Sequence, residues 1–156
     1  MTIIDFLSEG DHLTPGYKAT QTKFVGHEHF RVLNRQNLLE RLFQGNFNEN
    51  KLLILAHGGP TGIASASANG LKVTYVDILN SLNEIENQEP FELNLAAVCN
   101  SIAIEAYNNL FPPSLSILWC SENETSSIDA AFIINKFRDS GIAMLEEKGK
   151  YKNIIV

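Results

Sequence analysis

Mostly apolar runs alternate along the chain with segments whose apolar residues recur at helical spacing. Runs of this kind are typical of strands covered on both faces of a sheet, and they occur at Leu52–Ala56, Leu93–Val98 and Leu115–Trp119. Helical spacing is found at Gln36–Phe43, Tyr75–Ile85, Ile102–Leu110 and Ser127–Phe137. Residues Lys23–Leu33 are predicted to be extended. The alternation of strand and helix predicts an α/β fold with a largely parallel sheet flanked by helices.

The residues that follow the apolar runs are where a ligand site is expected. In open α/β sheets, binding and chemistry gather beyond the carboxyl ends of the parallel strands. These positions carry the triplets His57-Gly58-Gly59, Cys99-Asn100-Ser101 and Cys120-Ser121-Glu122. The segment Thr61–Gly70 is rich in Ser, Ala and Gly and is predicted to be a mobile loop.

Composition narrows the classes of function. A chain of 156 residues has the size of one domain, and we expect a single domain over residues 1–156 with its core at about 23–141. The net charge of −6 and the pI near 5.2 have the wrong sign for binding nucleic acid or an anionic membrane surface. No apolar run reaches the roughly 18 residues of a membrane span, and residues 1–10 lack the basic start of a secretory signal. A cytoplasmic protein is therefore expected.

The two cysteines, Cys99 and Cys120, are too few for a disulfide framework and are interpreted first as thiols. His57 follows one predicted strand and Cys99 follows the next, and the ends of parallel neighbours lie about 4.8 Å apart. A thiol beside an imidazole can act as nucleophile and base. The N–H groups of Gly58 and Cys99 are candidate oxyanion donors, and the start of a helix after Cys99 favours its thiolate.

Three segments together resemble the caspase-like cysteine peptidases, and in particular their bacterial CHAT-type branch. In that family one strand ends in His-Gly, the next in Ala-Cys-x-Ser/Thr-Gly, and a following strand in Trp. The matching segments are Leu53–Gly59, Leu95–Ser101 and Ile117–Trp119, and the resemblance covers about residues 51–141. It implies a caspase-like three-layer sandwich and a thiol protease with a dyad of Cys99 and His57. Gly58 and Cys99 would be the oxyanion donors, and no metal or cofactor is expected.

The resemblance also implies how the activity is used. Members act on protein or peptide substrates and are held inactive until a partner protein or a signal switches them on, often in bacterial stress or defence against phage. Members that cut after Arg or Lys often carry an aspartate two residues before the cysteine, where this chain has Ala97. A preference for basic residues would then depend on acidic groups after the third run, and the candidates are Glu122, Glu124 and Asp129.

Two departures from the family pattern leave a second function open. Ile102 stands where the family has glycine, and Val98 where a small residue is usual. The alternative is a catalytically inactive caspase-like domain that binds a peptide or a protein in a regulatory complex. A cysteine-dependent phosphatase is set aside, because Glu105 stands where its phosphate loop needs arginine. The Gly-x-Ser-x-Gly, Gly-x-Gly-x-x-Gly and Gly-x-x-x-x-Gly-Lys motifs are absent.

The remaining cysteine and histidines have plainer interpretations. Cys120 is expected to be a buried core residue, with a redox pair between Cys99 and Cys120 as the alternative. His27 and His29 share one face of an extended segment. No third ligand is spaced for a metal, so a solvated strand face is expected there.

Overall fold

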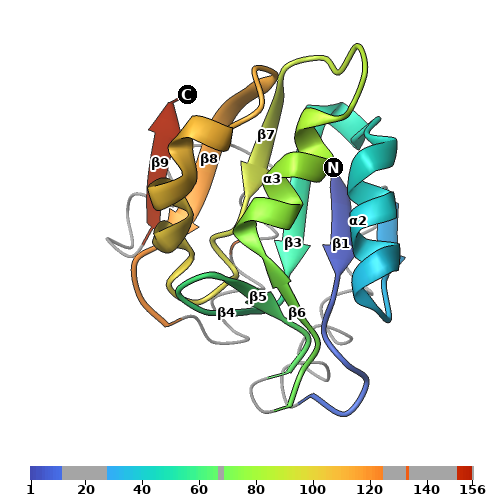
Figure 1. Cartoon of the computed structure of the whole chain (residues 1–156), viewed down its shortest axis with the longest axis vertical. Helices are drawn as coiled ribbons and strands as arrows, with labels where there is room; N and C mark the ends of the chain where they lie inside the picture. The colour runs from blue at the N-terminus through green and yellow to red at the C-terminus, as the bar shows by residue number, and fades with distance from the viewer. Residues whose placement is uncertain (12–27, 67–68, 125–132, 134–150, 156) are drawn as a thin grey trace.

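The central element of the protein is a sheet in which most strands are parallel. The structure is a computed structural model that describes residues 1–11, 28–66, 69–124, 133 and 151–155, the last segment by its backbone. The described strands follow the order β2 (Glu28–Arg31), β1 (Thr2–Asp5), β3 (Lys51–Leu55), β7 (Phe91–Asn94), β8 (Leu115–Ser121) and β9 (Tyr151–Ile155). The first five strands of this order are parallel, and β9 is antiparallel to β8 (Figure 1).

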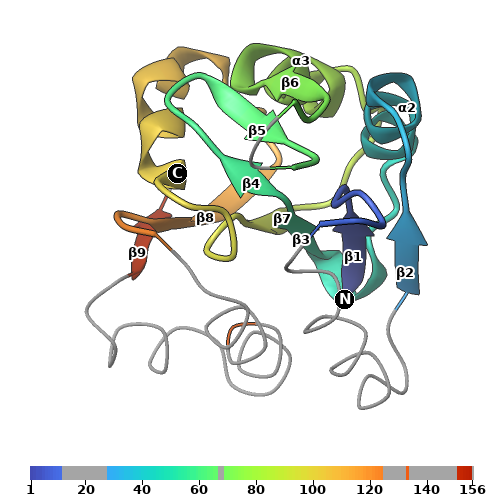
Figure 2. The ribbon, with the colours of Figure 1, turned by 90° about the horizontal axis from the view of Figure 1, so that it is seen from below.

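Helices cover one face of this sheet (Figure 2). They are α2 (Arg35–Gln44), α3 (Tyr75–Asn83) and the 3₁₀ helix η2 (Ser101–Leu110). The Asn34 side chain caps α2 and the Thr74 side chain caps α3, each by accepting a backbone N–H from the first turn. α2 ends at Gly45, whose φ of 62° is one that glycine adopts without strain. Among the described residues, no helix is long and apolar enough to cross a membrane.

The apolar sides of these helices pack on the sheet in one apolar cluster. It includes Leu38 and Leu42 of α2 and Ile78 and Leu82 of α3, all of them buried. Burying each side chain of this kind contributes about 1.5–3 kcal/mol to folding. The apolar residues at helical spacing in the sequence are therefore the residues that each helix buries against the sheet.

The opposite face of the sheet is also apolar. Ile3, Leu53, Leu55 and Trp119 form a second cluster there with Ile133, a residue in helical conformation. Strands buried on both faces need no alternation of polar and apolar residues, which explains the continuous apolar runs in the sequence. The predicted α/β class with a mostly parallel sheet is confirmed, and the arrangement is consistent with a three-layer sandwich.

A small antiparallel sheet lies beyond the carboxyl ends of β3 and β7 (Figure 1). Its strands are β4 (His57–Gly58), β5 (Gly62–Ala64) and β6 (Lys72–Thr74). Part of the segment predicted to be a loop is therefore a hairpin. Ile63 and Val73 anchor it, because both side chains are buried in the same cluster as the apolar sides of α2 and α3.

Several elements differ in extent from the prediction. β7 ends at Asn94 rather than Val98, because the Asn94 side chain accepts a hydrogen bond from the Ala96 N–H and begins a turn. The strands β1 and β9 lie outside the predicted core of 23–141. The predicted helix Ser127–Phe137 lies outside the described residues except for Ile133.

Candidate active site

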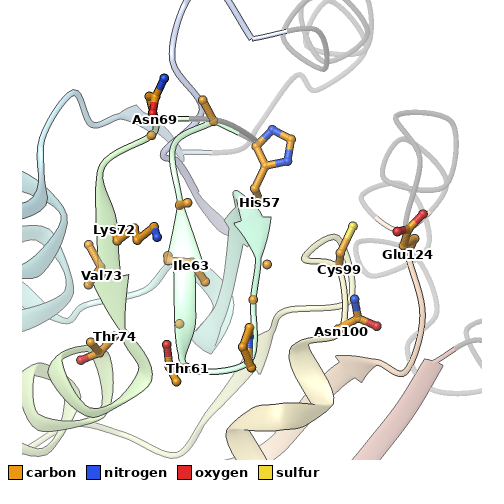
Figure 3. A pocket seen from close by; sticks show the side chains of 17 residues that line it. His57, Thr61, Ile63, Asn69, Lys72, Val73, Thr74, Cys99, Asn100 and Glu124 are labelled. Carbon is orange, nitrogen blue, oxygen red and sulfur yellow. The ribbon is translucent and has the colours of Figure 1, made fainter.

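His57 and Cys99 line one cleft between the small sheet and the turn that precedes η2 (Figure 3). The cleft has a volume of about 600 Å³. His57 begins β4 shortly after the end of β3, and Cys99 follows the turn after β7, the neighbour of β3 in the main sheet. Their imidazole and thiol groups point toward the same end of the cleft (Figure 3). The structure therefore brings together the two residues predicted as base and nucleophile.

Gly58 packs directly against the backbone of Cys99. A Cβ atom at position 58 would overlap the carbonyl oxygen of Cys99 and would lie 2.8 Å from Cγ1 of Val98. Glycine allows this close approach because it has no side chain. The contact fixes the distance between the chain at His57 and the chain at Cys99.

The N–H of Gly58 points toward the open edge of β4. Gly59 and Gly62 close the hairpin, with the Gly59 N–H donating to the Gly62 carbonyl oxygen at 2.9 Å. Hydrogen-bonded and non-bonded pairs alternate along an antiparallel ladder, so the next pair, Gly58 and Ile63, is non-bonded. The Gly58 N–H therefore points away from β5.

A buried polar network holds the turn that carries Cys99. The Ser101 hydroxyl donates to the Leu95 carbonyl oxygen at 2.7 Å and accepts from the Ser121 N–H at 2.9 Å. Ser101 and Ser121 are fully buried, so these bonds satisfy groups that water does not reach. The network joins both ends of the turn to the end of β8.

The backbone after Cys99 turns at Asn100. Asn100 has a φ of 53° and donates its N–H to the Asn123 carbonyl oxygen at 3.0 Å. Asparagine is one of the non-glycine residues that tolerate this left-handed conformation. Ile102, at the position of the family's glycine, has no positive φ and packs against the apolar cluster of the helices. The local backbone therefore does not require glycine at position 102.

Asp11 is a site residue that the sequence analysis missed. Its Oδ2 lies 2.7 Å from Nε2 of His57, and its side chain is only 2% exposed. Asp11 belongs to the segment after β1, and β1 is the neighbour of β3 on the side opposite β7. No motif surrounds Asp11, so the available signal was its position after the short apolar segment that forms β1.

The candidate specificity residues lie in different places. Glu124 is exposed and lines the cleft, whereas Glu122 is exposed and is not one of its lining residues. Asp129 lies outside the described residues. Lys72 of β6 lines the cleft as well, so the cleft carries both a lysine and a glutamate side chain.

Cys120 and His29 do not line this cleft. Cys120 is fully buried among the apolar residues and forms no disulfide with Cys99. His29 lies 3.7 Å from the buried carboxylate of Asp5, and His27 lies outside the described residues. In the described part of the chain, no group of three or more His, Cys, Asp or Glu side chains could hold a metal ion.

No protein-family model and no curated protein matches the sequence. The function is therefore inferred from the geometry and the chemistry of the cleft.

Proposed function

We propose that the protein is a cysteine endopeptidase of the caspase-like type, with Cys99 as the nucleophile and His57 as the general base and acid. The observation that carries the proposal is the packing of Gly58, the residue after His57, on the backbone of Cys99 within one cleft. A thiol and an imidazole held together in this way form the pair that covalent acyl transfer requires.

The proposed reaction begins with transfer of the thiol proton from Cys99 to His57. The thiolate attacks the carbonyl carbon of the scissile peptide, a C–S bond forms, and the carbonyl electron pair moves to oxygen. When this intermediate collapses, the C–N bond breaks and His57 protonates the leaving amine. Water then attacks the thioester while His57 accepts its proton. When this second intermediate collapses, the C–S bond breaks, His57 returns its proton to the sulfur of Cys99, and the carboxylic acid product is released.

The backbone of the cleft supports stabilisation of the oxyanion. The Gly58 N–H points away from β5 at the open edge of β4, and we assign it with the Cys99 N–H as the donors to the developing negative charge. Fixed backbone donors of this kind typically contribute 10²–10³ in rate each, because they need no reorganisation during the reaction.

The acidic side chain of Glu124 supports a peptide with a basic side chain as substrate. Glu124, on the loop after β8, lines the cleft near Cys99 and is exposed to an incoming side chain (Figure 3). We propose that Glu124 is the acidic residue that binds the basic side chain of the substrate. The sequence had indicated three candidates for this role, Glu122, Glu124 and Asp129. As in the family that the chain resembles, we expect a partner protein or a signal to control the activity.

The test is labelling of the folded protein with iodoacetamide at neutral pH, followed by mass spectrometry. We expect rapid alkylation of Cys99, much slower alkylation in the His57→Gln variant, and no alkylation of the buried Cys120. The same proteins are then incubated with a peptide library, with and without lysate of the source cells. Cleavage that disappears in Cys99→Ala supports the peptidase.

Two results would overturn the proposal. One is a Cys99 alkylation rate that does not depend on His57. The other is binding of library peptides without cleavage, equal in the wild type and in Cys99→Ala, under every condition. The second result identifies the alternative function, a catalytically inactive domain that binds peptides in the same cleft.

A further inference from the structure

We propose that Asp11 is a positioning residue for His57, so that the site consists of three side chains rather than two. Its carboxylate accepts a hydrogen bond from the Nε2–H of His57 and leaves Nδ1 as the nitrogen that exchanges a proton with Cys99. This inference rests on the proposed peptidase function for its role in catalysis, but the hydrogen bond itself can be tested without any activity.

The position of Asp11 is fixed by its own segment. After β1, the Phe6 N–H donates to the Leu55 carbonyl oxygen at 2.9 Å, and the Ser8 N–H donates to the Ser65 carbonyl oxygen at 2.8 Å. The Asp11 N–H then donates to the Ser8 carbonyl oxygen at 3.1 Å and closes a turn. These bonds attach the segment to the end of β3 and to the hairpin that begins with His57. The carboxylate is therefore held in place by the same elements that carry the imidazole.

The burial of Asp11 and His57 strengthens the hydrogen bond between them. The side chain of Asp11 is 2% exposed and that of His57 is 14% exposed, while Oδ2 and Nε2 are 2.7 Å apart. A charge-assisted hydrogen bond of this length, shielded from water, is about twice as strong as a neutral one. An ionised carboxylate acts only as an acceptor, so it selects the tautomer with the proton on Nε2.

The selected tautomer is the one that base catalysis needs. With the proton on Nε2, the lone pair of Nδ1 is available to accept the thiol proton of Cys99. Figure 3 shows one ring nitrogen of His57 on the side of the ring that faces Cys99. After the transfer, the imidazolium remains hydrogen-bonded to the carboxylate, which stays ionised and stabilises the positive charge. Asp11 thus acts through His57 and not on the substrate.

A purely structural role for Asp11 makes a different prediction. A buried polar residue that only fills space and satisfies a hydrogen bond can be replaced by asparagine, which has the same shape and keeps an acceptor oxygen. Asp11→Asn keeps the shape of the side chain, removes the negative charge and replaces one acceptor oxygen by an NH2 donor. If the charge stabilises the imidazolium, this variant must lose kcat while its fold and its KM are kept.

The first experiment is NMR of the ¹⁵N-labelled wild-type protein, with His57→Gln to assign the ring signals. We expect His57 to carry its proton on Nε2, with slow exchange of that proton with water, and the slow exchange to disappear in Asp11→Ala. A proton found on Nδ1 in the wild type, or slow exchange that persists in Asp11→Ala, would overturn the inference. This result stands even if the protein proves not to cut peptides.

The second experiment compares Asp11→Asn with Asp77→Asn, which makes the same change of charge at a partly exposed position of α3, outside the cleft. In Asp11→Asn we expect kcat and the rate of Cys99 alkylation to fall about 100-fold or more, within the usual range for acid–base catalysis, and KM to change less than about threefold. Asp77→Asn should keep the wild-type values. Wild-type kcat in Asp11→Asn contradicts the inference, whereas absence of cleavage by the wild type contradicts only the proposed function.

Discussion

Gly58 and Cys99 are in contact through their backbones, although they come from the ends of two different parallel strands. The place of a side chain at position 58 is taken by the Cys99 carbonyl oxygen, with the Val98 side chain beside it. The small sheet is thereby seated on the turn that carries Cys99, and the geometry of the cleft depends on the absence of a single methyl group.

Gly58→Ala is expected to damage both stability and site. The added Cβ must displace backbone rather than the end of a flexible side chain, so we expect the free energy of unfolding to fall by about 1–3 kcal/mol. Alkylation of Cys99 should also slow. Urea unfolding and timed alkylation measure the two effects. Gly59→Ala is the matched control, because its Cβ would lie 3.7 Å from the Gly62 carbonyl oxygen, an ordinary contact. Equal behaviour of the two variants would show that the Gly58 contact is not restrictive.

Ser101→Ala is expected to loosen the turn that carries Cys99. It leaves the Leu95 carbonyl oxygen and the Ser121 N–H without the hydroxyl that bridges them, at a cost of about 1–3 kcal/mol. Ser116→Ala is the control, since its hydroxyl donates to the Phe91 carbonyl oxygen at 2.8 Å near the start of β8, at the other end of the strand. We expect only Ser101→Ala to change the alkylation rate of Cys99. An effect of the same size in Ser116→Ala would mean that the rate reports general stability.

Glu124→Gln is expected to weaken a preference for basic substrates. The carboxylate lines the cleft but is exposed, so its attraction for an Arg or Lys side chain should contribute no more than about 1 kcal/mol, or about fivefold in kcat/KM. Peptides with an uncharged residue at the cleavage site should be cut at unchanged rates. Glu122→Gln removes a neighbouring charge that does not line the cleft and should leave the preference intact. If the two variants act alike, the effect comes from the net charge of the loop.

Asp77 is expected to make stability depend on pH in the acid range. The hydrogen bond from Arg35, at 2.7 Å, and the cap with Thr74 hold the pKa of the Asp77 carboxyl below its usual value. Because the pKa is lower in the folded state, this stability is complete above the unfolded pKa near 3.8 and is lost as the pH falls through the lower, folded pKa. The pair is partly exposed, so we expect less than about 1 kcal/mol. Urea unfolding of the wild type and Asp77→Asn should differ at pH 7 and converge near pH 2. A constant difference would rule out the ionised pair as its source.

The elements that the sequence predicted well are those whose signal is local. Leu52–Ala56 and Leu115–Trp119 are continuous apolar runs, and Tyr75–Ile85 has a helical stripe, so burial alone determines them. The positions of His57 and Cys99 follow from the same runs, because residues after parallel strands gather at one edge. Fold class and candidate dyad could therefore be inferred from one sequence.

The elements that were missed depend on distant partners. β1 has only four residues and is a central strand because it pairs with β2 on one side and β3 on the other. β4 has two residues and exists only as part of the hairpin. Asp11 could not be identified without β1, and its contact with His57 spans 46 residues of sequence. Asn94 ends β7 early through a single side-chain hydrogen bond, which apolar spacing does not reveal.

The order β1-β3-β7 has a consequence for the growing chain. During synthesis, Asp11 and His57 leave the ribosome first, and Cys99 follows only after β7. The cleft closes when Gly58 can rest on the Cys99 turn, which itself requires Ser121 at the end of β8. An unfinished chain therefore holds Cys99 without the cleft that we propose activates it. Under the proposed function, the thiol becomes reactive with the last parallel strand, so a reagent for Cys99 would also report when the five parallel strands are in place.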